Sequence, residues 1–240
     1  YTLLVPRWTV EARFSGDSRE LRSCIHSRVW SWKIPDLTET QLRAPWDQEA
    51  VLGGGFNNDG TRAVLRTKPL SLANQATQLL HWDVDSDREI WRYEDAREKR
   101  SLGNPVYSHD GRYIVVPSRT SQLERPEIPT AFHDELHVLD AKTGRLHRTF
   151  KPEQAFNIDS IVFRPGSSDV AAIVSKKVDA QSPSNEIVIW NVETGLELST
   201  TQVDDGSPTL VCFSHDGNEL LVAQKVEGGV LVLDAETCTR

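Results

Sequence analysis

His133 and His137 are the first residues whose types and spacing could support chemistry. They stand four apart in His133-Asp134-Glu135-Leu136-His137, and on a helix this spacing places both imidazoles on one face, as in zinc sites. The apolar alternation from Leu136 to Leu139 predicts a strand instead, where residues four apart are separated by about 13 Å. A zinc ion also needs further ligands in tetrahedral reach, so we expect no metal site.

Two His-Asp dipeptides, His109-Asp110 and His215-Asp216, have the composition of a general base and its orienting acid. A catalytic role also requires a nucleophile and an oxyanion site within reach. The sequence contains no G-x-S-x-G motif, no Walker-type loop and no G-x-G-x-x-G motif. We therefore expect both dipeptides to serve as turns in a chain that is not an enzyme and binds no cofactor.

The turn that holds these dipeptides recurs five times and defines the elements of the chain. It follows an apolar strand that ends in an aromatic residue, and it reads Phe14-Ser15-Gly16-Asp17, Phe56-Asn57-Asn58-Asp59-Gly60, Tyr107-Ser108-His109-Asp110-Gly111, Phe163-Arg164-Pro165-Gly166 and Phe213-Ser214-His215-Asp216-Gly217. A second turn follows each copy: Trp32-Lys33 with Asp36, Trp82-Asp83 with Ser86, Leu139-Asp140 with Thr143-Gly144, Trp190-Asn191 with Thr194-Gly195, and Leu233-Asp234 with Thr237. Asp and Asn side chains accept backbone N–H groups in such turns, and Gly supplies the positive φ. Repeats with about four short strands each are typical of β-propeller blades.

The order of the two turns, F-S-x-D-G and then W-D-x-x-T-G, resembles the WD40 repeat from Val10 to Thr237. The resemblance implies an all-β β-propeller of four-stranded antiparallel blades, one domain over residues 1–240 with repeats near 9–45, 50–94, 102–150, 157–202 and 207–240. No Gly-His dipeptide precedes any repeat, so we expect the His-centred hydrogen-bond network of strict WD40 blades to be absent. Only three repeats keep Trp in the second turn, which leaves a YVTN-type or quinoprotein-like propeller as an alternative.

Composition narrows the classes of partner. Lys and Arg number 27 against 35 Asp and Glu, giving a formal net charge of −8, which opposes binding to nucleic acid or to an anionic membrane. Cys24, Cys212 and Cys238 show no CxxC spacing, a pattern typical of reduced thiols. No apolar run approaches the roughly 18 residues of a membrane span. We expect a cytoplasmic protein that binds neither nucleic acid nor membrane.

Two arrangements of the blades fit the sequence. Thr2 to Val5 could pair with the last repeat and close a five-bladed ring. The chain contains no Met, even at its first position, and this favours a piece of a larger propeller. Such a piece carries an unpaired blade edge at each end, so we expect the chain to associate.

The longest connections stand at one topological position, between the second and third strands of repeats two, three and four. They run from Lys68 to Thr77, from Arg119 to Asp134 and from Lys176 to Asn185. Long loops on a rigid sheet framework often bind partners. We therefore expect a non-enzymatic scaffold or sensor propeller that binds a protein or peptide on the face bearing these loops.

The binding residues follow from the composition of those loops. We expect Arg119, Arg125 and Phe132 to contact the partner, with Arg97 and Arg100 of the connection between repeats two and three as a charged rim. The alternative is the propeller domain of an enzyme, either a peptidase gating domain or a quinoprotein-like fragment. A hydrolase motif in the flanking sequence would identify the gating domain.

Overall fold

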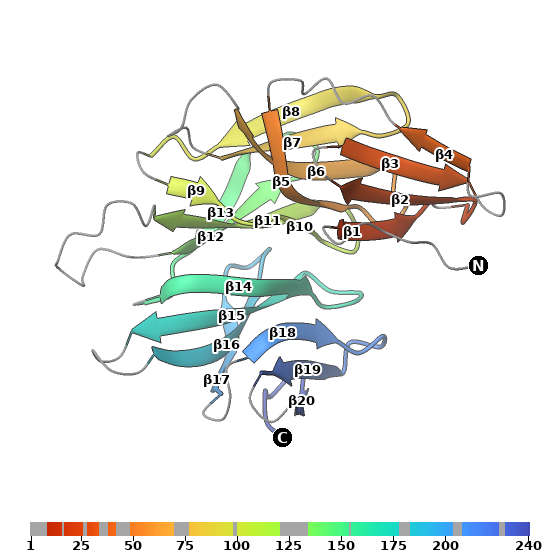
Figure 1. Cartoon of the computed structure of the whole chain (residues 1–240). Helices are drawn as coiled ribbons and strands as arrows, with labels where there is room; N and C mark the ends of the chain where they lie inside the picture. Colours follow the sequence, from red (N-terminus) through yellow and green to blue (C-terminus); the bar gives the residue numbers. More distant parts are fainter. Residues whose placement is uncertain are drawn as a thin grey trace.

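The chain folds into antiparallel β-sheets (Figure 1). The computed structural model describes residues 9–15, 17–25, 28–33, 38–41, 49–69, 77–97, 100–120, 134–153, 155–177, 183–203, 208–225 and 229–240. More than half of the chain lies in strands, and the described residues include no helix. The expected all-β class is therefore confirmed. No described helix has the length and apolar character to cross a membrane.

Five sheets follow one another along the sequence, from red to blue in Figure 1. The first contains β1 (Thr9–Phe14), β2 (Glu20–Ile25), β3 (Arg28–Lys33) and β4 (Thr38–Gln41), and the second contains β5 (Glu49–Phe56), β6 (Arg62–Pro69), β7 (Gln78–Asp83) and β8 (Arg88–Glu94). The third contains β9 (Arg100–Leu102), β10 (Val106–Tyr107), β11 (Tyr113–Thr120), β12 (Glu135–Asp140) and β13 (Leu146–Phe150). The fourth contains β14 (Ala155–Phe163), β15 (Asp169–Lys177), β16 (Pro183–Asn191) and β17 (Glu197–Gln202), and the fifth contains β18 (Pro208–Phe213), β19 (Glu219–Gln224) and β20 (Val230–Asp234).

In the first, third and fifth sheets the first hairpin turn is held by a serine and an aspartate. Ser108 Oγ donates to Asp110 Oδ1 at 2.6 Å, and Ser214 Oγ donates to Asp216 Oδ1 at the same distance. Both His-Asp dipeptides thus lie in turns, where each aspartate bonds within its own turn. Hydrogen bonds from Ser214 and from the amide of Asn218 lower the pKa of Asp216.

The second turn joins the third and fourth strands through a left-handed residue. Asp140 Oδ1 accepts from the amide and the hydroxyl of Thr143, each at 2.7 Å, and Gly144 follows with φ 69°. A Cβ at Gly144 would lie 2.6 Å from the Trp91 ring, whose Nε1 donates to Ala141 O at 2.9 Å. The turn therefore requires glycine for both its backbone and its packing.

The third sheet has a divided first strand. β9 and β10 both pair with β11, with Leu102 opposite Ser118 and Val106 opposite Val115. The division lies beside Pro117, whose carbonyl accepts from the Gly103 amide at 2.7 Å. Because proline has no N–H, it cannot complete a ladder with a continuous partner strand.

The core lies between consecutive sheets. Phe163 and Trp190 of the fourth sheet pack against Val115, Leu136 and Val138 of the third. The first strands of consecutive sheets are neighbours, since β1 packs beside β5, β5 beside β10, β10 beside β14 and β14 beside β18. Among the described residues no packing of comparable extent returns from the fifth sheet to the first, and no closed propeller is formed. Thr2 to Val5 lie outside the described residues, so their pairing stays a prediction.

Candidate functional site

A group of interacting polar side chains, four of them buried, lies where the second and third sheets meet. We call it the junction cluster, and it consists of Tyr93, Asp95, Arg97, Arg100, Ser118, Glu135 and His137. It occupies the edge from which the connection between β11 and β12 leaves the third sheet.

Strand pairing brings the members of the junction cluster together. Tyr93 lies near the end of β8, and the chain continues through Asp95 and Arg97 into β9. β9 pairs with β11, and β11 pairs with β12 so that Ser118 lies opposite Glu135. Since alternate residues of a strand share a face, His137 points to the same side of β12 as Glu135.

Arg97 links the two buried carboxylates of the cluster. Its Nε donates to Asp95 Oδ1 at 2.8 Å and its Nη2 to Asp95 Oδ2 at 2.6 Å, while its Nη1 lies 2.7 Å from Glu135 Oε2. Ser118 Oγ also donates to Asp95 Oδ2 at 2.6 Å. Burial acts to raise the pKa of Asp95, but the hydrogen bonds from Arg97 and Ser118 outweigh it and hold that pKa far below its usual range.

Glu135 is ionised for the same kind of reason. Burial acts to raise the pKa of this carboxyl, but the hydrogen bond from Arg97 and the charge of Arg100 have the larger effect, so the pKa of Glu135 is lowered. Lys151 adds a third cation, with Nζ 3.3 Å from Glu135 Oε1. The cluster therefore holds ionised carboxylates inside, with Arg97 and Lys151 toward the solvent and Arg100 largely buried.

His137 is the centre of the hydrogen-bond network. Its Nε2 lies 3.0 Å from Arg97 Nη2, and its Nδ1 lies 2.8 Å from Tyr93 Oη. Nε2 also lies 3.3 Å from Glu135 Oε2, so this nitrogen faces both a guanidinium, which only donates, and a carboxylate, which only accepts. Burial lowers the pKa of His137, and burial, followed by the charge of Asp95, raises the pKa of Tyr93 to about 12. Both groups are therefore neutral at pH 7.

The network differs from the one that strict WD40 blades build around the His of a Gly-His dipeptide, whose absence stays a prediction. His137 lies on the third strand of its own sheet and contacts Tyr93, Arg97 and Glu135. The available signal was Glu135-x-His137, two ionisable residues on the same face of a strand that is otherwise Leu and Val. Asp95 and Ser118 gave no comparable signal, since they join the cluster only through strand pairing.

Three of the predicted binding residues lie along this edge and bond within the chain. Arg97 contacts Asp95 and Glu135 as above. Arg100 Nη1 donates to Ser118 O at 2.9 Å, and Arg119 Nη2 donates to Ile158 O at 2.7 Å and to Asp159 Oδ1 at 2.5 Å. The other two predicted residues, Arg125 and Phe132, lie outside the described residues.

A row of cations marks the same edge across four sheets. A basic residue lies at the end of the second strand of each of these sheets: Lys68, Arg119 and Lys176 are second from the end of β6, β11 and β15, and Lys225 follows β19. Lys176 Nζ lies 2.6 Å from Glu186 Oε2 of the paired strand. Although the chain is acidic overall, this edge repeatedly carries basic side chains, of which Arg119 and Lys176 pair with Asp159 and Glu186. Within the described part of the chain, no group of three or more His, Cys, Asp or Glu side chains could hold a metal ion.

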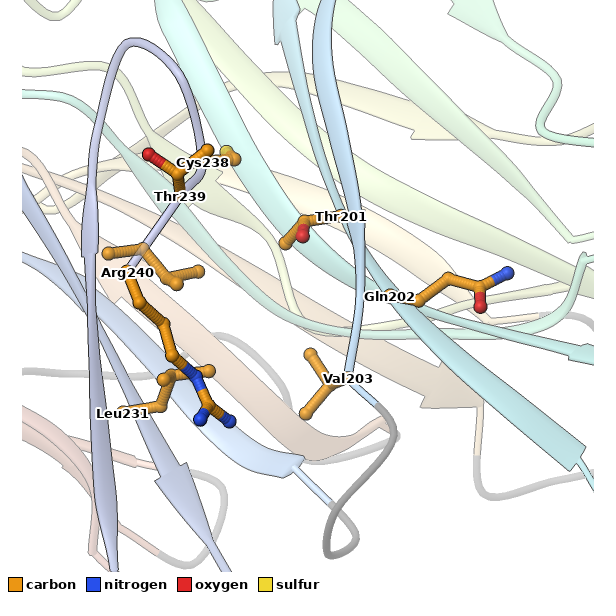
Figure 2. Close-up of a pocket in the computed structure, with 8 residues that line it drawn as sticks. Thr201, Gln202, Val203, Leu231, Cys238, Thr239 and Arg240 are labelled. Atoms are coloured by element: carbon orange, nitrogen blue, oxygen red, sulfur yellow. The ribbon is translucent and has the colours of Figure 1, made fainter.

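A separate hollow of 360 Å³ lies between the fourth and fifth sheets (Figure 2). Its walls come from the end of β17, from β20 and from the turn after β20, where Arg240 extends alongside Leu231. Cys238 belongs to this wall, and burial raises the pKa of its thiol. The hollow brings together fewer interacting charges than the junction cluster, which is therefore the stronger candidate site.

Comparison with known proteins supports the fold. No family model and no curated protein sequence matches the chain. Its structure is similar to hydrazine synthase of Kuenenia stuttgartiensis, a protein that contains a β-propeller, with a TM-score of 0.68 and 15% sequence identity. The match covers 93% of this chain and 64% of that one, less than two thirds of its length. At this identity the likeness concerns the propeller-like fold and carries no activity to this chain.

Proposed function

We propose that the chain is a WD40-like β-propeller that serves as a non-enzymatic scaffold and binds a protein or peptide on the edge of the sheets where the junction cluster lies. The row of cations on this edge is the observation that carries the proposal. The connections 68–77, 119–134 and 176–185 leave the sheets at the same edge, so a partner bound there also meets the longest loops.

The junction cluster supports this function by fixing cations before binding. Arg97 is 45% exposed and Lys151 is 66% exposed, while the carboxylates that hold them are 6% exposed. Cations held by buried carboxylates lose less conformational freedom when a partner arrives, which favours binding. An acidic or carbonyl-rich segment is the partner that fits these groups, and its association should weaken as salt is added.

Site-specific cross-linking tests the assignment of the edge. A photoreactive residue is placed at Lys151, and in a second variant at Lys142, an exposed lysine in the turn at the opposite edge of the same sheet. We expect one partner to cross-link to position 151 in an extract of the source cells and not to position 142, with less product at high salt. Cross-linking of that partner from position 142 alone would refute the proposal.

A further inference from the structure

Arg66 places a positive charge at the junction between the second and third sheets. It lies on β6 and alternates with Val64, which belongs to the core shared by these two sheets. Its Nη2 donates to Leu52 O at 3.0 Å and its Nη1 to Leu102 O at 3.4 Å. Its buried Nε has no hydrogen-bond partner in the part of the chain that the structure describes. The guanidinium therefore keeps donors that these residues do not use.

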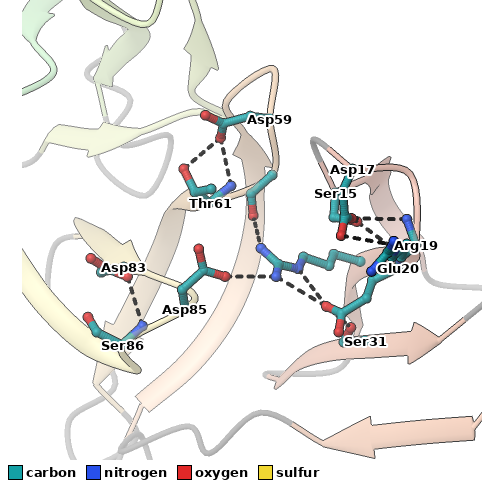
Figure 3. A network of polar contacts seen from close by, with 12 residues as sticks. Ser15, Asp17, Arg19, Glu20, Ser31, Asp59, Thr61, Asp83, Asp85 and Ser86 are labelled. Carbon is teal, nitrogen blue, oxygen red and sulfur yellow. Dashed lines mark hydrogen bonds and ion pairs between the residues drawn. The ribbon is translucent and has the colours of Figure 1, made fainter.

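Arg22 shows how a comparable arginine is compensated at the junction between the first and second sheets (Figure 3). Its Nη1 donates to Gly60 O at 2.6 Å, so this guanidinium also bonds to a carbonyl of the following sheet. Its Nη2 lies 3.1 Å from Glu20 Oε2 and 2.8 Å from Asp85 Oδ1. Among the described residues Arg66 forms no ion pair of this kind, so no neighbouring carboxylate neutralises its charge.

The surroundings of Arg66 disfavour its charge. Burial, followed by the charge of Arg119, lowers the pKa of Arg66, but a guanidinium stays protonated at pH 7. Arg119 is itself paired, with Nη2 2.5 Å from Asp159 Oδ1. One uncompensated positive charge thus remains at a half-buried position, and a group with one negative charge is the ligand that neutralises it.

The backbone opposite Arg66 carries no side chain. Gly53 is its partner on β5 and is followed by two further glycines. A Cβ at Gly53 would lie 2.3 Å from Asn104 Oδ1 and 3.8 Å from Arg66 Nε, so the Asn104 amide lies over the glycine and beside the guanidinium. Asn104 is exposed, and its Nδ2 is a further donor for a ligand at this position.

The position lies beside the junction cluster on the same face of the second sheet. Arg66 is opposite Leu79, and Leu79 is opposite Tyr93 of the cluster. Two strand spacings separate Arg66 from Tyr93, or about 10 Å. About three residues of an extended segment span this distance, so one bound segment reaches both Arg66 and the cations of the cluster.

We propose that Arg66 binds an acidic side chain of the partner, whose carboxylate accepts from the guanidinium and from Asn104 Nδ2. The inference rests on the proposed function, in which an acidic segment binds this edge. A carboxylate matches Arg66 in charge, and its two oxygens match the planar fork of N–H donors. Because Arg66 is partly shielded from water, this pair should contribute more to binding than a pair with an exposed lysine.

Asn104→Asp tests the proposal without altering a buried residue, because it supplies a carboxylate beside Arg66 from within the chain. The probe is a fluorescently labelled hexaglutamate peptide with an amidated C-terminus, and binding to the 240-residue chain is measured by fluorescence anisotropy. We expect the Kd of Asn104→Asp to rise about tenfold and its melting temperature to rise by about 2 °C. Lys142→Met is the control, since it changes the net charge equally at an exposed turn of the opposite edge, and its Kd should change less than about twofold.

Arg66→Met provides the second variant, and circular dichroism establishes that it is folded. Its Kd for hexaglutamate should also rise about tenfold, because methionine keeps the apolar reach of the side chain and donates no hydrogen bond. An Asn104→Asp chain with the Kd and melting temperature of the wild type would mean that Arg66 is already paired within the chain, and this result would overturn the proposal. Equal Kd changes in Arg66→Met and Lys142→Met would overturn it as well.

Cross-linking at position 151 separates this inference from the proposed function. Undiminished cross-linking of the partner in an Arg66→Met background would refute the role of Arg66 and leave the edge assignment intact. Loss of that cross-link in Arg66→Met, with cross-linking retained in Lys142→Met, is the result that the proposal predicts.

Discussion

His81 should make the protein less stable as the pH falls below neutrality. The side chain lies on β7, is 4% exposed, and packs against Trp91 and Tyr107 with ring centroids 4.7 and 5.9 Å away. Neither ring nitrogen has a hydrogen-bond partner among the described residues. Burial, together with the charge of Arg62, lowers the pKa of His81 from 6.5 to about 4, because a charged imidazole has no compensation there.

The direction and size of the effect follow from proton linkage. Above pH 6.5 the imidazole is neutral in both the folded and the unfolded chain. As the pH falls from 6.5 toward 4, the unfolded chain binds the proton first, and the free energy of unfolding decreases. The loss is about 2 kcal/mol at pH 5 and approaches about 3 kcal/mol below pH 4.

Urea denaturation of the wild-type chain and of His81→Leu between pH 7.5 and 5 measures this contribution. Leucine has a similar volume and no titrating group, so the variant should lose about 2 kcal/mol less than the wild type over that range. His137 and the carboxylates are common to both proteins and cancel in the difference. His215→Gln, in an exposed turn, is the control and should follow the wild type.

Parallel pH profiles for the wild type and His81→Leu would refute the reasoning. They would mean that the buried imidazole reaches a water or a proton acceptor in the folded protein, so that its proton affinity equals that of the unfolded chain.

Three further experiments test the turns, the cluster and the loops. Gly144→Ala should lower the free energy of unfolding by about 2 kcal/mol or more, because the new methyl group strains the left-handed backbone and also clashes with the Trp91 indole. Gly111 has φ 70° but open space around it, so Gly111→Ala should lower the free energy of unfolding by only about 1 kcal/mol. Thermal unfolding measures both. Asp95→Asn should lower the free energy of unfolding by about 2 kcal/mol, because it removes charge-assisted hydrogen bonds from Arg97 and Ser118. An unchanged midpoint of urea denaturation would contradict a stabilising role of these hydrogen bonds. Replacing Arg125 and Phe132 together with Ala should weaken partner recovery several-fold without changing the melting temperature, a result opposite to that expected for structural residues.

The sequence predicted the parts of the fold that depend on neighbouring residues. Ser108 and Asp110 form their turn from positions two apart, so the motif that predicts the turn also contains the atoms that hold it. The apolar alternation from Leu136 to Leu139 is equally local, and the strand predicted from it is confirmed, since this segment lies within β12. Packing between sheets requires apolar residues on both faces of a strand, and the continuous apolar run of β16 supplies them, with Val188 and Trp190 on one face and Ile187 and Ile189 on the other.

The junction cluster could not be predicted in this way. Asp95, Ser118 and His137 are distant in the sequence, and their contact depends on the register of β9 against β11, which the divided strand alters. Arg97, Arg100 and Arg119 lie along the expected edge, but no spacing rule indicated that Arg97 would bond to Asp95 and Glu135. The sequence shows which residues are cationic, whereas the carboxylate that each cation contacts depends on how the strands are arranged in the folded chain.

The division of the first strand beside Pro117 has a consequence for local unfolding. β9 has three residues, and the short strand is joined to β10 through Gly103, so it can detach from β11 while β10 stays paired. Such an opening requires less free energy than global unfolding, and it carries Arg100 away from Ser118. The amides of β9 should therefore exchange with deuterium earlier than those of Ile114 and Val115, which makes this segment a separable unit inside a rigid sheet.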